Sequence, residues 1–525
     1  MAQKYDVIVI GGGHNGLVHA AYLARAGRRV VVLERRHVLG GASVSEEIVP
    51  GFTFSVCSYV VSLLRPEIIR ELDLPKYGLE ILPLDGTFTP MPNGNYLWRM
   101  SDHWRTLREI ARHSRADAEV YDEYAVAMVE MARFVKPMLE LTPPDPLSLH
   151  PRGLRDLGAV LQRFRALTRQ DQLTQIQLMT MSAVDFLDRW FETDVLKATM
   201  SASGIIGTFL GVRSPGTAYV LLHHYMGEID GAFRAWGLPR GGTGAISNAI
   251  ALAAEAAGVE IRTETGVSKI LLKNGRAHGV VLENGDEIHA SVVSSSLDPR
   301  QTFERLVGPS HLDPTFAADL KRYKYRGSSG KVNLALDALP DFTALPGPGA
   351  HLRGAISISP GVDYMERAYD EAKHGWYSSH PYMDIVIPSL TDPSVAPAGK
   401  HVMSCFVQYA PYHLVNGDWD QERERFGDTV VDTIATFAPN IKDVIVGRQV
   451  LTPLDIERMV GLSEGNIFQG ELTLEQLFFL RPAPGWAQYR TPIKNLYMCG
   501  SATHPGGGIM GAPGRNAALK VMADA

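Results

Sequence analysis

The first 34 residues constrain the fold more than any other part of the chain. Residues 7–10 form a short, wholly apolar run, which is typical of a central parallel strand buried on both faces. A glycine-rich turn over 11–16 follows directly and leads into a stretch of mainly small and apolar residues over 17–27. A second apolar run covers 28–33 and ends at Glu34. This order of strand, glycine turn, helix, strand and acid predicts a β-α-β unit of an α/β fold.

Each glycine of the turn has a physical role in such a unit. Gly11 permits the tight turn from strand to helix, Gly13 lets the backbone approach a pyrophosphate, and Gly16 allows the helix to pack closely on the strand. The start of the helix offers unpaired N–H groups and a positive dipole end to phosphates. Glu34 is placed to accept hydrogen bonds from a ribose diol. The residues expected to contact a dinucleotide here are Gly11, Gly13, His14, Asn15, Gly16 and Glu34.

A glycine pair at Gly40 and Gly41 follows the second predicted strand and is itself followed by Ala42. Such a pair lets the chain pass close beside the pyrophosphate, so we expect contacts from all three residues. Arg35 or Arg36, at the end of the strand, is a candidate to supply positive charge to the phosphates. As solvated charges at the end of a strand they fit the sequence equally well.

The C-terminus repeats the pattern of a strand followed by a glycine-rich turn. Residues 495–500 read as a strand ending in glycine, and glycines at 506–508 precede a helical tail over 516–522. The turn presents backbone N–H groups and a helix dipole to an anionic edge of a ligand. The residues expected to contact the ligand here are Gly500, Gly507, Gly508, Ile509 and Met510.

The middle of the chain contains a third group of such elements. A glycine-rich turn over 238–244 precedes an alanine-rich helix over 245–257. Apolar runs at 259–261, 267–271 and 279–282 predict three strands. The long segments before and after this group lack the nucleotide-binding pattern.

We therefore expect two domains, each assembled from separate segments of the chain. A Rossmann-like α/β domain that binds the dinucleotide would combine residues 1–100, 235–300 and 461–525. A mixed α+β substrate domain would combine residues 101–234 and 301–460, the first of which is rich in helical patterns.

Composition excludes several classes of protein. Among 525 residues, 51 Lys and Arg stand against 57 Asp and Glu, and the net charge of −6 gives no footprint for nucleic acid. Three cysteines without a CxxC pair form neither a disulfide framework nor a dithiol redox site, and no cluster of ligands predicts a metal. No signal segment precedes the first strand, and no window reaches the roughly 18 apolar residues of a membrane span. We expect a cytoplasmic protein; peripheral membrane contact and a homodimer are both compatible with the sequence.

Together these features resemble the carotenoid/retinoid oxidoreductases, which are phytoene desaturase-like FAD flavoproteins related in fold to amine oxidases, along nearly the whole chain. The segments that support the resemblance are GGGHNGL at 11–17, ERRHVLGG at 34–41, EEIVPGF at 46–52, SLLRP at 62–66, YVLLHHYMG at 219–227, GNIFQG at 465–470 and ATHPGGG at 502–508.

The resemblance implies FAD as the cofactor. In these flavoproteins the C-terminal glycine turn lies near the pyrimidine side of the flavin, and the backbone of a strand matching Val267 meets the adenine ring. Arginine usually follows the glycine pair in this superfamily, whereas Ala42 and Ser43 follow it here, so no phosphate contact from an arginine is expected at that point. The chain shows one nucleotide fingerprint and no cysteine pair, which favours oxygen or a quinone over NAD(P) as the electron acceptor.

Four residues are candidates for acid–base or orienting roles beside the flavin. They are His223, His224, Tyr225 and His504. Histidine titrates in the useful range, although each of these is individually compatible with a structural role. We interpret 223–224 as part of a strand, on which adjacent side chains point in opposite directions, so at most one of the two histidines should face the flavin.

The favoured function is that of an FAD-dependent oxidoreductase that dehydrogenates, or isomerises through the flavin, a small apolar unsaturated substrate. One alternative is an oxidase of C–N bonds of the amine oxidase type. Met510 and Ala512 weigh modestly against it, because such an enzyme would place aromatic walls there. The other alternative is a flavin-bearing interaction or regulatory protein with little turnover, because cofactor binding and catalysis use different residues.

Overall fold

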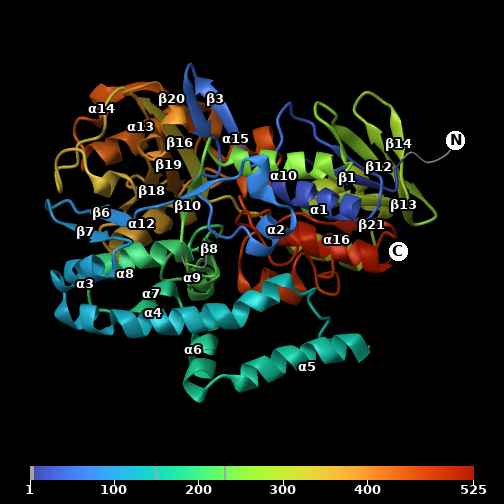
Figure 1. The fold of residues 1–525 in the computed structure, drawn as a ribbon, viewed down its shortest axis with the longest axis horizontal. Coiled ribbons are helices and arrows are strands. Elements are labelled where there is room, and N and C mark those ends of the chain that lie inside the picture. Colours follow the sequence, from blue (N-terminus) through green and yellow to red (C-terminus); the bar gives the residue numbers. More distant parts are fainter. Residues whose placement is uncertain (1–4, 148–150, 230–231, 234, 525) are drawn as a thin grey trace.

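The computed structural model describes residues 5–147, 151–229, 232–233 and 235–524, and two sheets organise it (Figure 1). The first is a five-stranded parallel sheet with the order β11-β2-β1-β15-β21. Its strands are β1 (Val7–Ile10), β2 (Val30–Leu33), β11 (Glu260–Arg262), β15 (Val292–Ser295) and β21 (Leu496–Met498). Segments from the start, middle and end of the chain therefore meet in one sheet.

Side chains of the central strands point alternately to the two faces of this sheet, and a different layer covers each face. In β1, Val7 and Val9 pack toward a layer of helices, whereas Ile8 and Ile10 pack toward a small antiparallel sheet on the other face. The helices of this layer are α1 (His14–Arg25), α10 (Gly244–Ala256) and α16 (Ala512–Asp524). The small sheet consists of β12 (Val267–Lys273), β13 (Arg276–Leu282) and β14 (Glu287–His289).

The second main sheet has seven strands in the order β20-β16-β19-β18-β17-β6-β7. Its strands are β6 (Thr87–Pro90), β7 (Tyr96–Arg99), β16 (Ser329–Leu336), β17 (Ala355–Ile358), β18 (Tyr382–Val386), β19 (His401–Gln408) and β20 (Ile445–Leu451). One of its faces packs in an apolar core that includes residues of α13 (Trp419–Ala435) and α14 (Ile441–Val444). The opposite face bears the polar side chains that matter for the site.

Helices between β7 and the middle of the chain form a separate layer, seen in the lower half of Figure 1. They are α3 (His103–Ala111), α4 (Arg115–Val135), α5 (Pro151–Ala166), α6 (Arg169–Thr180), α7 (Ala183–Leu187), α8 (Asp194–Ser201) and α9 (Thr217–Tyr225). The predicted helical character of this segment is confirmed. Within the described residues, no helix combines the length and apolarity required to cross a bilayer.

Shorter elements connect these layers. The helices are α2 (Pro66–Glu71), α11 (Pro314–Arg322), α12 (Val362–Lys373) and α15 (Pro453–Val460). The strands are β3 (Ser45–Val49), β4 (Phe52–Ser55), β5 (Ile81–Pro83), β8 (Glu228–Ile229), β9 (Ala232–Phe233) and β10 (Gly237–Pro239).

The membership of the sheets differs from the predicted segments at one place. The first segment of the nucleotide-binding domain was expected to extend to residue 100, but β6 and β7 lie within it and pair in the seven-stranded sheet. They are a hairpin joined to β17 by parallel pairing, a contact between residues far apart in the sequence that local patterns do not reveal.

Candidate functional site

The turn from β1 to α1 has the geometry of a phosphate-binding loop. Gly11 has φ +93°, and a Cβ added there would lie 2.6 Å from Oγ of Ser296. A Cβ at Gly16 would lie 2.3 Å from the carbonyl oxygen of Gly11, so this glycine allows the close contact of helix and strand. A Cβ at Gly13 would meet no atom within 4 Å. The loop is thus closely packed at Gly11 and Gly16 and open at Gly13, as a bound pyrophosphate requires.

The glycine pair predicted to approach the same phosphates lies against this loop. Gly13 and Gly40 form an isolated parallel bridge, and a Cβ at Gly41 would lie 3.6 Å from Cα of Gly13. Gly40 has φ +118° and leaves room for the carbonyl of Ser43, which a Cβ would approach to 2.1 Å. The two glycine motifs, which are separated in sequence by β2, therefore form one surface.

Glu34 lies at the carboxyl end of β2 and is 8% exposed. Its Oε2 accepts a hydrogen bond from the backbone N–H of Gly12 at 2.8 Å, and its Oε1 accepts one from the N–H of Arg36 at 2.9 Å. These bonds fix the carboxylate at a cavity of about 510 Å³, which we call the strand-end cavity. Residues that line it include Gly11, Leu33, Glu34, Arg35, Val267 and Leu306.

Arg35 has a different environment from the one that a phosphate contact would need. Its Nη2 donates to the backbone carbonyls of Arg458 at 3.1 Å and Met459 at 3.0 Å, in the last turn of α15. Val267 lines the same cavity as Glu34 and Arg35. The structure therefore brings together the two residues that the sequence associates with the adenosine part of the cofactor, and it ties Arg35 to α15.

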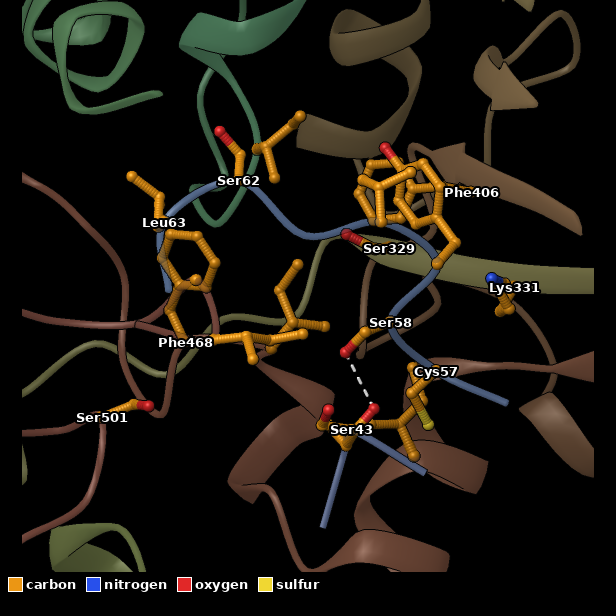
Figure 2. A pocket seen from close by; sticks show the side chains of 18 of the residues that line it. Ser43, Cys57, Ser58, Ser62, Leu63, Ser329, Lys331, Phe406, Phe468 and Ser501 are labelled. Atoms are coloured by element: carbon orange, nitrogen blue, oxygen red, sulfur yellow. Dashed lines mark hydrogen bonds between the residues drawn. The ribbon is translucent and has the colours of Figure 1, made fainter. Parts of the chain in front are cut away.

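A second cavity, of about 900 Å³, begins on the other side of the glycine loop and extends to the seven-stranded sheet (Figure 2). We call it the inner cavity. The part of the molecule built on the five-stranded parallel sheet contributes His14, Ala42, Ser43, Ser501, Gly508 and Ile509. The seven-stranded sheet contributes Ser329, Gly330, Lys331 and Phe406, and intervening segments contribute Tyr59, Val60, Ile206, Trp236, Ile467 and Phe468, with others. Figure 2 shows Phe468 and Leu63 on one side of it and Lys331 and Phe406 on the other.

Three buried polar atoms of the glycine loop and the inner cavity have no partner among the described residues. Nε2 of His14 and Oδ1 of Asn15 belong to the loop, and Oγ of Ser62 belongs to the lining of the inner cavity. Burial lowers the pKa of His14 to about 4, so its imidazole is neutral at physiological pH. Unpartnered buried polar atoms are costly, and those of His14 and Asn15, which directly follow the open Gly13, fit the phosphate and ribityl groups of a flavin dinucleotide. The residues present therefore fit such a cofactor.

The wall of the inner cavity opposite the glycine loop has a buried lysine. Lys331 on β16 is 2% exposed, and its Nζ donates to Oγ of Ser404 at 2.6 Å and lies 5.0 Å from the centre of the Tyr59 ring. Burial lowers the pKa of Lys331 to about 8. A group with this pKa exchanges a proton near neutral pH, which makes Lys331 the cation of the cavity most suited to acid–base chemistry.

Tyr59 connects Lys331 to a partly buried acid, Asp384. Its hydroxyl donates to Oδ2 of Asp384 at 2.7 Å, and its ring stacks on Phe406 with centroids 5.5 Å apart. Burial raises the pKa of Asp384 to about 6, which the hydrogen bond from Tyr59 and the nearby Lys331 partly oppose. Lys331, Tyr59 and Asp384 thus form a buried polar group on one face of the seven-stranded sheet.

The predicted catalytic residues on α9 have different surroundings from those expected. His223 and His224 lie in the last turn of a helix, so the interpretation of 223–224 as a strand is wrong. Val220, Leu221 and Leu222 give a continuous apolar run, which helix and strand share when the run is buried on all sides. Only His224 lines the inner cavity, where it stacks on Trp236 with centroids 5.8 Å apart.

The other three candidates lie outside the linings of the described cavities. Nε2 of His223 lies 3.4 Å from the carbonyl of Gly507, and the hydroxyls of Tyr225 and Tyr124 are 3.0 Å apart in a helical core. Nε2 of His504 lies 2.8 Å from the carbonyl of Met138. Burial lowers the pKa of His504 to about 4 and that of His223 to about 3, so both are neutral.

The C-terminal glycine turn is held in place by a buried arginine. Arg481 is fully buried and donates to five backbone carbonyls, those of Phe468, Gly470, Glu471, Gln476 and Ser501. Two of these residues, Phe468 and Ser501, line the inner cavity. A Cβ added at Gly500 would lie 2.2 Å from the carbonyl oxygen of Ser296, and one added at Gly507 would lie 2.6 Å from the ring of Phe468. Met510 is buried in the helical core.

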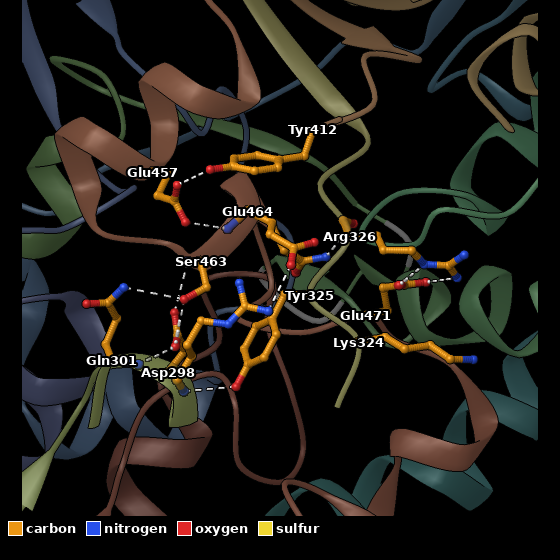
Figure 3. A network of polar contacts seen from close by, with 12 residues as sticks. Asp298, Gln301, Lys324, Tyr325, Arg326, Tyr412, Glu457, Ser463, Glu464 and Glu471 are labelled. Atoms are coloured by element: carbon orange, nitrogen blue, oxygen red, sulfur yellow. Dashed lines mark hydrogen bonds and ion pairs between the residues drawn. The ribbon is translucent and has the colours of Figure 1, made fainter. Parts of the chain in front are cut away.

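A network of polar contacts links the two sheets beside the strand-end cavity (Figure 3). Asp298, which follows β15, is fully buried and accepts hydrogen bonds from the N–H and hydroxyl of Ser463 at 2.9 Å and 3.0 Å. Arg300 pairs with Glu464 at 2.8 Å, and Nε and Nη2 of Arg326 donate to the two carboxylate oxygens of the buried Glu471. These contacts fix the segments that cross between the sheets.

The sequence interpretation missed Lys331, Tyr59 and Asp384. The sequence of β16 could have indicated such a site. Its polar residues Ser329, Lys331 and Asn333 share one face and apolar residues occupy the other, and all eight residues of the strand are buried. Polar side chains at every second position of a buried strand indicate a second face directed at a site rather than at solvent.

Comparisons with known proteins agree with this geometry. A model of the family described as flavin containing amine oxidoreductase matches residues 16–519. The chain is 41% identical to pyridine nucleotide-disulfide oxidoreductase domain-containing protein 2 of Rattus norvegicus, over 100% of this chain and 94% of that protein. It is 27% identical to a subunit of the limonene dehydrogenase of Castellaniella defragrans, over 99% and 95%. A solved structure of a putrescine oxidase triple mutant aligns with a TM-score of 0.61 at 16% identity, over 99% of each chain, and shares the fold.

Proposed function

Because the chain belongs to the flavin-containing amine oxidoreductase family, we propose that it binds FAD and dehydrogenates, or isomerises through the flavin, a small apolar unsaturated substrate. Membership of the family makes it a flavin-dependent oxidoreductase. The choice of FAD and of the substrate class is supported by the residues of the two cavities.

The strand-end cavity and the glycine loop provide the residues that would hold FAD. Glu34 would accept from the adenosine ribose, and the N–H groups at the start of α1 would bind the pyrophosphate at the open face of Gly13. His14 and Ser501 line the inner cavity, where the flavin end would lie. When bound, FAD supplies the electron-accepting chemistry, and the protein supplies binding, orientation and the exclusion of water.

The charge of the inner cavity is the observation that favours an apolar substrate. Among the described residues that line it there is no Asp or Glu, and Lys331 is its one Lys or Arg. An ammonium group would therefore find no carboxylate partner there and would be repelled by Lys331 when that side chain is charged. Val60, Ile206 and Phe468, with other apolar side chains, provide a surface for a hydrocarbon.

Lys331 and His224 are the residues of the cavity that would handle a proton. Burial lowers the pKa of Lys331 to about 8, so the lysine both takes up and releases protons near neutrality. His224, whose pKa burial lowers to about 4, stays neutral and would orient the substrate. Flavin dehydrogenation removes a hydride and a proton, and Lys331 is the proposed acceptor of that proton.

Oxidation of a C–N bond is the second candidate. The aromatic side chains of Tyr59, Phe406 and Trp236 in the inner cavity favour it, because aromatic rings bind amines through their faces. A neutral amine would also tolerate the nearby Lys331. The fold shared with putrescine oxidase is compatible with either reaction.

Anaerobic reduction of the FAD-loaded protein separates these proposals. We expect limonene, the substrate named for one relative, or another apolar alkene to bleach the flavin absorbance, and cyclohexylamine and putrescine to leave it unchanged. Bleaching by amines alone would establish the second candidate. A flavin that dithionite reduces but that none of the alkenes or amines reduces would favour a regulatory flavoprotein. Reoxidation of the reduced protein by oxygen, a soluble quinone and NAD(P)⁺ then tests the proposed acceptors, oxygen or quinone.

A further inference from the structure

The seven-stranded sheet lines another cavity, of about 1420 Å³, next to the inner one. We call it the outer cavity. The two share three lining residues, Val60, Ile206 and Trp236, which therefore form the partition between them. Tyr382 and Asp384 of β18 line the outer cavity only, and Lys331 and Phe406 line the inner cavity only.

One face of the sheet continues from the inner cavity to the outer one. Lys331 of β16 is directly opposite Phe406 of β19, which is opposite Asp384 of β18, which in turn is opposite Ser357 of β17. Neighbouring strands are about 4.8 Å apart, so Lys331 and Asp384 are separated by roughly 10 Å across the sheet. A molecule lying along this face would therefore reach from one cavity into the other.

The lining of the outer cavity includes a largely buried tyrosine, Tyr382, which is 2% exposed. No described residue makes a hydrogen bond with its hydroxyl, and this oxygen is not one of the fully enclosed polar atoms that lack a partner. Burial raises the pKa of Tyr382 well above its usual value, so the hydroxyl keeps its proton and remains a donor. A buried tyrosine hydroxyl normally has a partner, and here only the contents of the cavity can provide one.

The charges around the outer cavity favour an uncharged partner. Its lining has one cation, Arg99, and one acid, Asp384, among the described residues. Asp384 already accepts a hydrogen bond from Tyr59, and Arg99 has an interaction partner within the protein. Neither a free carboxylate nor a free ammonium would therefore find an excess of opposite charge, whereas a hydroxyl or carbonyl oxygen would satisfy Tyr382.

We propose that the outer cavity is a second substrate subsite, in which Tyr382 binds the uncharged hydroxyl or carbonyl end of an elongated molecule whose apolar part lies in the inner cavity. The inference rests on the proposed function, which places an apolar unsaturated group beside the flavin. It adds that an unsaturated alcohol, aldehyde or ketone should bind more tightly than the hydrocarbon of the same length. Trp236, in the partition, contacts the middle of this molecule.

Farnesol and farnesene test the proposal, because they share a fifteen-carbon chain and differ in the terminal hydroxyl. Binding to the FAD-loaded protein is measured by competition with a fluorescent apolar dye, for the wild type and for Tyr382→Phe. We expect the substitution to weaken farnesol binding by roughly fivefold to tenfold, the effect of one net hydrogen bond, and to leave farnesene binding within about twofold. Tyr364→Phe is the control, because its hydroxyl donates to the carbonyl of Pro381 and lies outside both cavity linings.

Equal effects of Tyr382→Phe on both probes, or none on either, would overturn the second subsite and leave the proposed function intact. If the wild type binds neither probe, the apolar inner site fails as well. The flavin content and melting temperature of each variant confirm that it is folded, and the substitution removes a single oxygen atom from a side chain whose ring remains.

Discussion

Individual residues in this protein have roles that their type alone does not reveal. Glu34 and Lys331 are buried and Asp384 is partly buried, and each of these ionisable side chains has different partners. Glu34 is held by two backbone N–H groups, Lys331 by one hydroxyl and an aromatic ring, and Asp384 by Tyr59. On the basis of these environments we propose that Glu34 binds the cofactor and that the other two lie on the substrate side.

Replacing Glu34 by Gln tests the first assignment. We expect the variant to fold and to bind FAD at least tenfold more weakly, because hydrogen bonds to a charged group contribute about 1.5–3 kcal/mol. The dissociation constant is measured by reconstituting the apoprotein. Glu283→Gln is a matched control, because Glu283 lines the same cavity but is exposed. Equal affinities of Glu34→Gln and the wild type would remove Glu34 from the cofactor site.

Lys331 should reduce stability at neutral pH, because its charge is buried without a carboxylate directly bonded to it. Its pKa falls from about 10.5 in the unfolded chain to about 8 in the folded protein, so the unfolded state binds more protons between these values. The free energy of unfolding contributed by Lys331 therefore rises with pH from 8 to 10.5, by roughly 3 kcal/mol.

We thus expect Lys331→Met to be more stable than the wild type below pH 8, and this advantage to disappear by about pH 10.5. Urea unfolding of both proteins at several pH values measures it. An advantage that is constant with pH would show that the packing of the side chain, and not its charge, determines the difference.

The helices and strands of this chain differ in how far neighbouring residues in the sequence determine their structure. The strands at 7–10 and 28–33 and the glycine turn between them are confirmed, β2 being shorter at its start, because strand, turn and helix signals agree within 28 residues. The strands predicted at 267–271 and 279–282 are confirmed as parts of β12 and β13. Where the signal was an apolar run buried on all sides, as in α9, the interpretation as a strand was wrong.

The seven-stranded sheet shows why the substrate side could not be predicted as completely. Its pairings join β6 to β17 and β16 to β20, which are separated by long stretches of chain, and no local pattern specifies such contacts. The residues proposed to bind FAD lie in short sequence motifs, whereas Lys331, Tyr59 and Asp384 meet only in the fold.

Substitution of two glycines in the turn from β1 to α1 should have different effects, one on FAD affinity and the other on stability. Gly13→Ala should fold normally, because the added Cβ meets no atom, and it should bind FAD at least tenfold more weakly if the cofactor lies over that face. Gly16→Ala should cost about 1–3 kcal/mol of stability, because its Cβ would approach the carbonyl of Gly11 to 2.3 Å. Thermal unfolding of the apoproteins and FAD titration separate the two effects. Normal FAD affinity in Gly13→Ala would contradict the phosphate site.

Arg481 should determine the stability of the C-terminal glycine turn. Its guanidinium makes hydrogen bonds to five carbonyls in a fork that an ammonium cannot reproduce, so Arg481→Lys should lower the free energy of unfolding by roughly 3 kcal/mol. Denaturant unfolding measures this. Arg305→Lys, at a half-exposed side chain, should change stability by less than about 0.5 kcal/mol. Similar small effects of both substitutions would show that water replaces the bonds of Arg481.

At the scale of the whole molecule, we propose that one sheet carries the cofactor site and the other carries the polar face of the substrate site. The parallel sheet and its helices present the glycine loop and Glu34, and the seven-stranded sheet presents the polar face that includes Lys331. The inner cavity lies between them, and the network of Asp298, Arg300 and Glu464 fixes their junction (Figure 3). The segments predicted from the sequence differ from this division at β6 and β7, whose partners in the sheet lie far along the chain.

The visible absorption spectrum of the purified protein, with identification of any flavin released by acid precipitation, tests the central claim most directly. We predict a yellow protein that releases FAD, because the glycine loop, Glu34 and the unpartnered His14 together fit a flavin dinucleotide. A colourless protein that added FAD does not reconstitute would contradict the proposed cofactor site and, with it, the oxidoreductase that we infer.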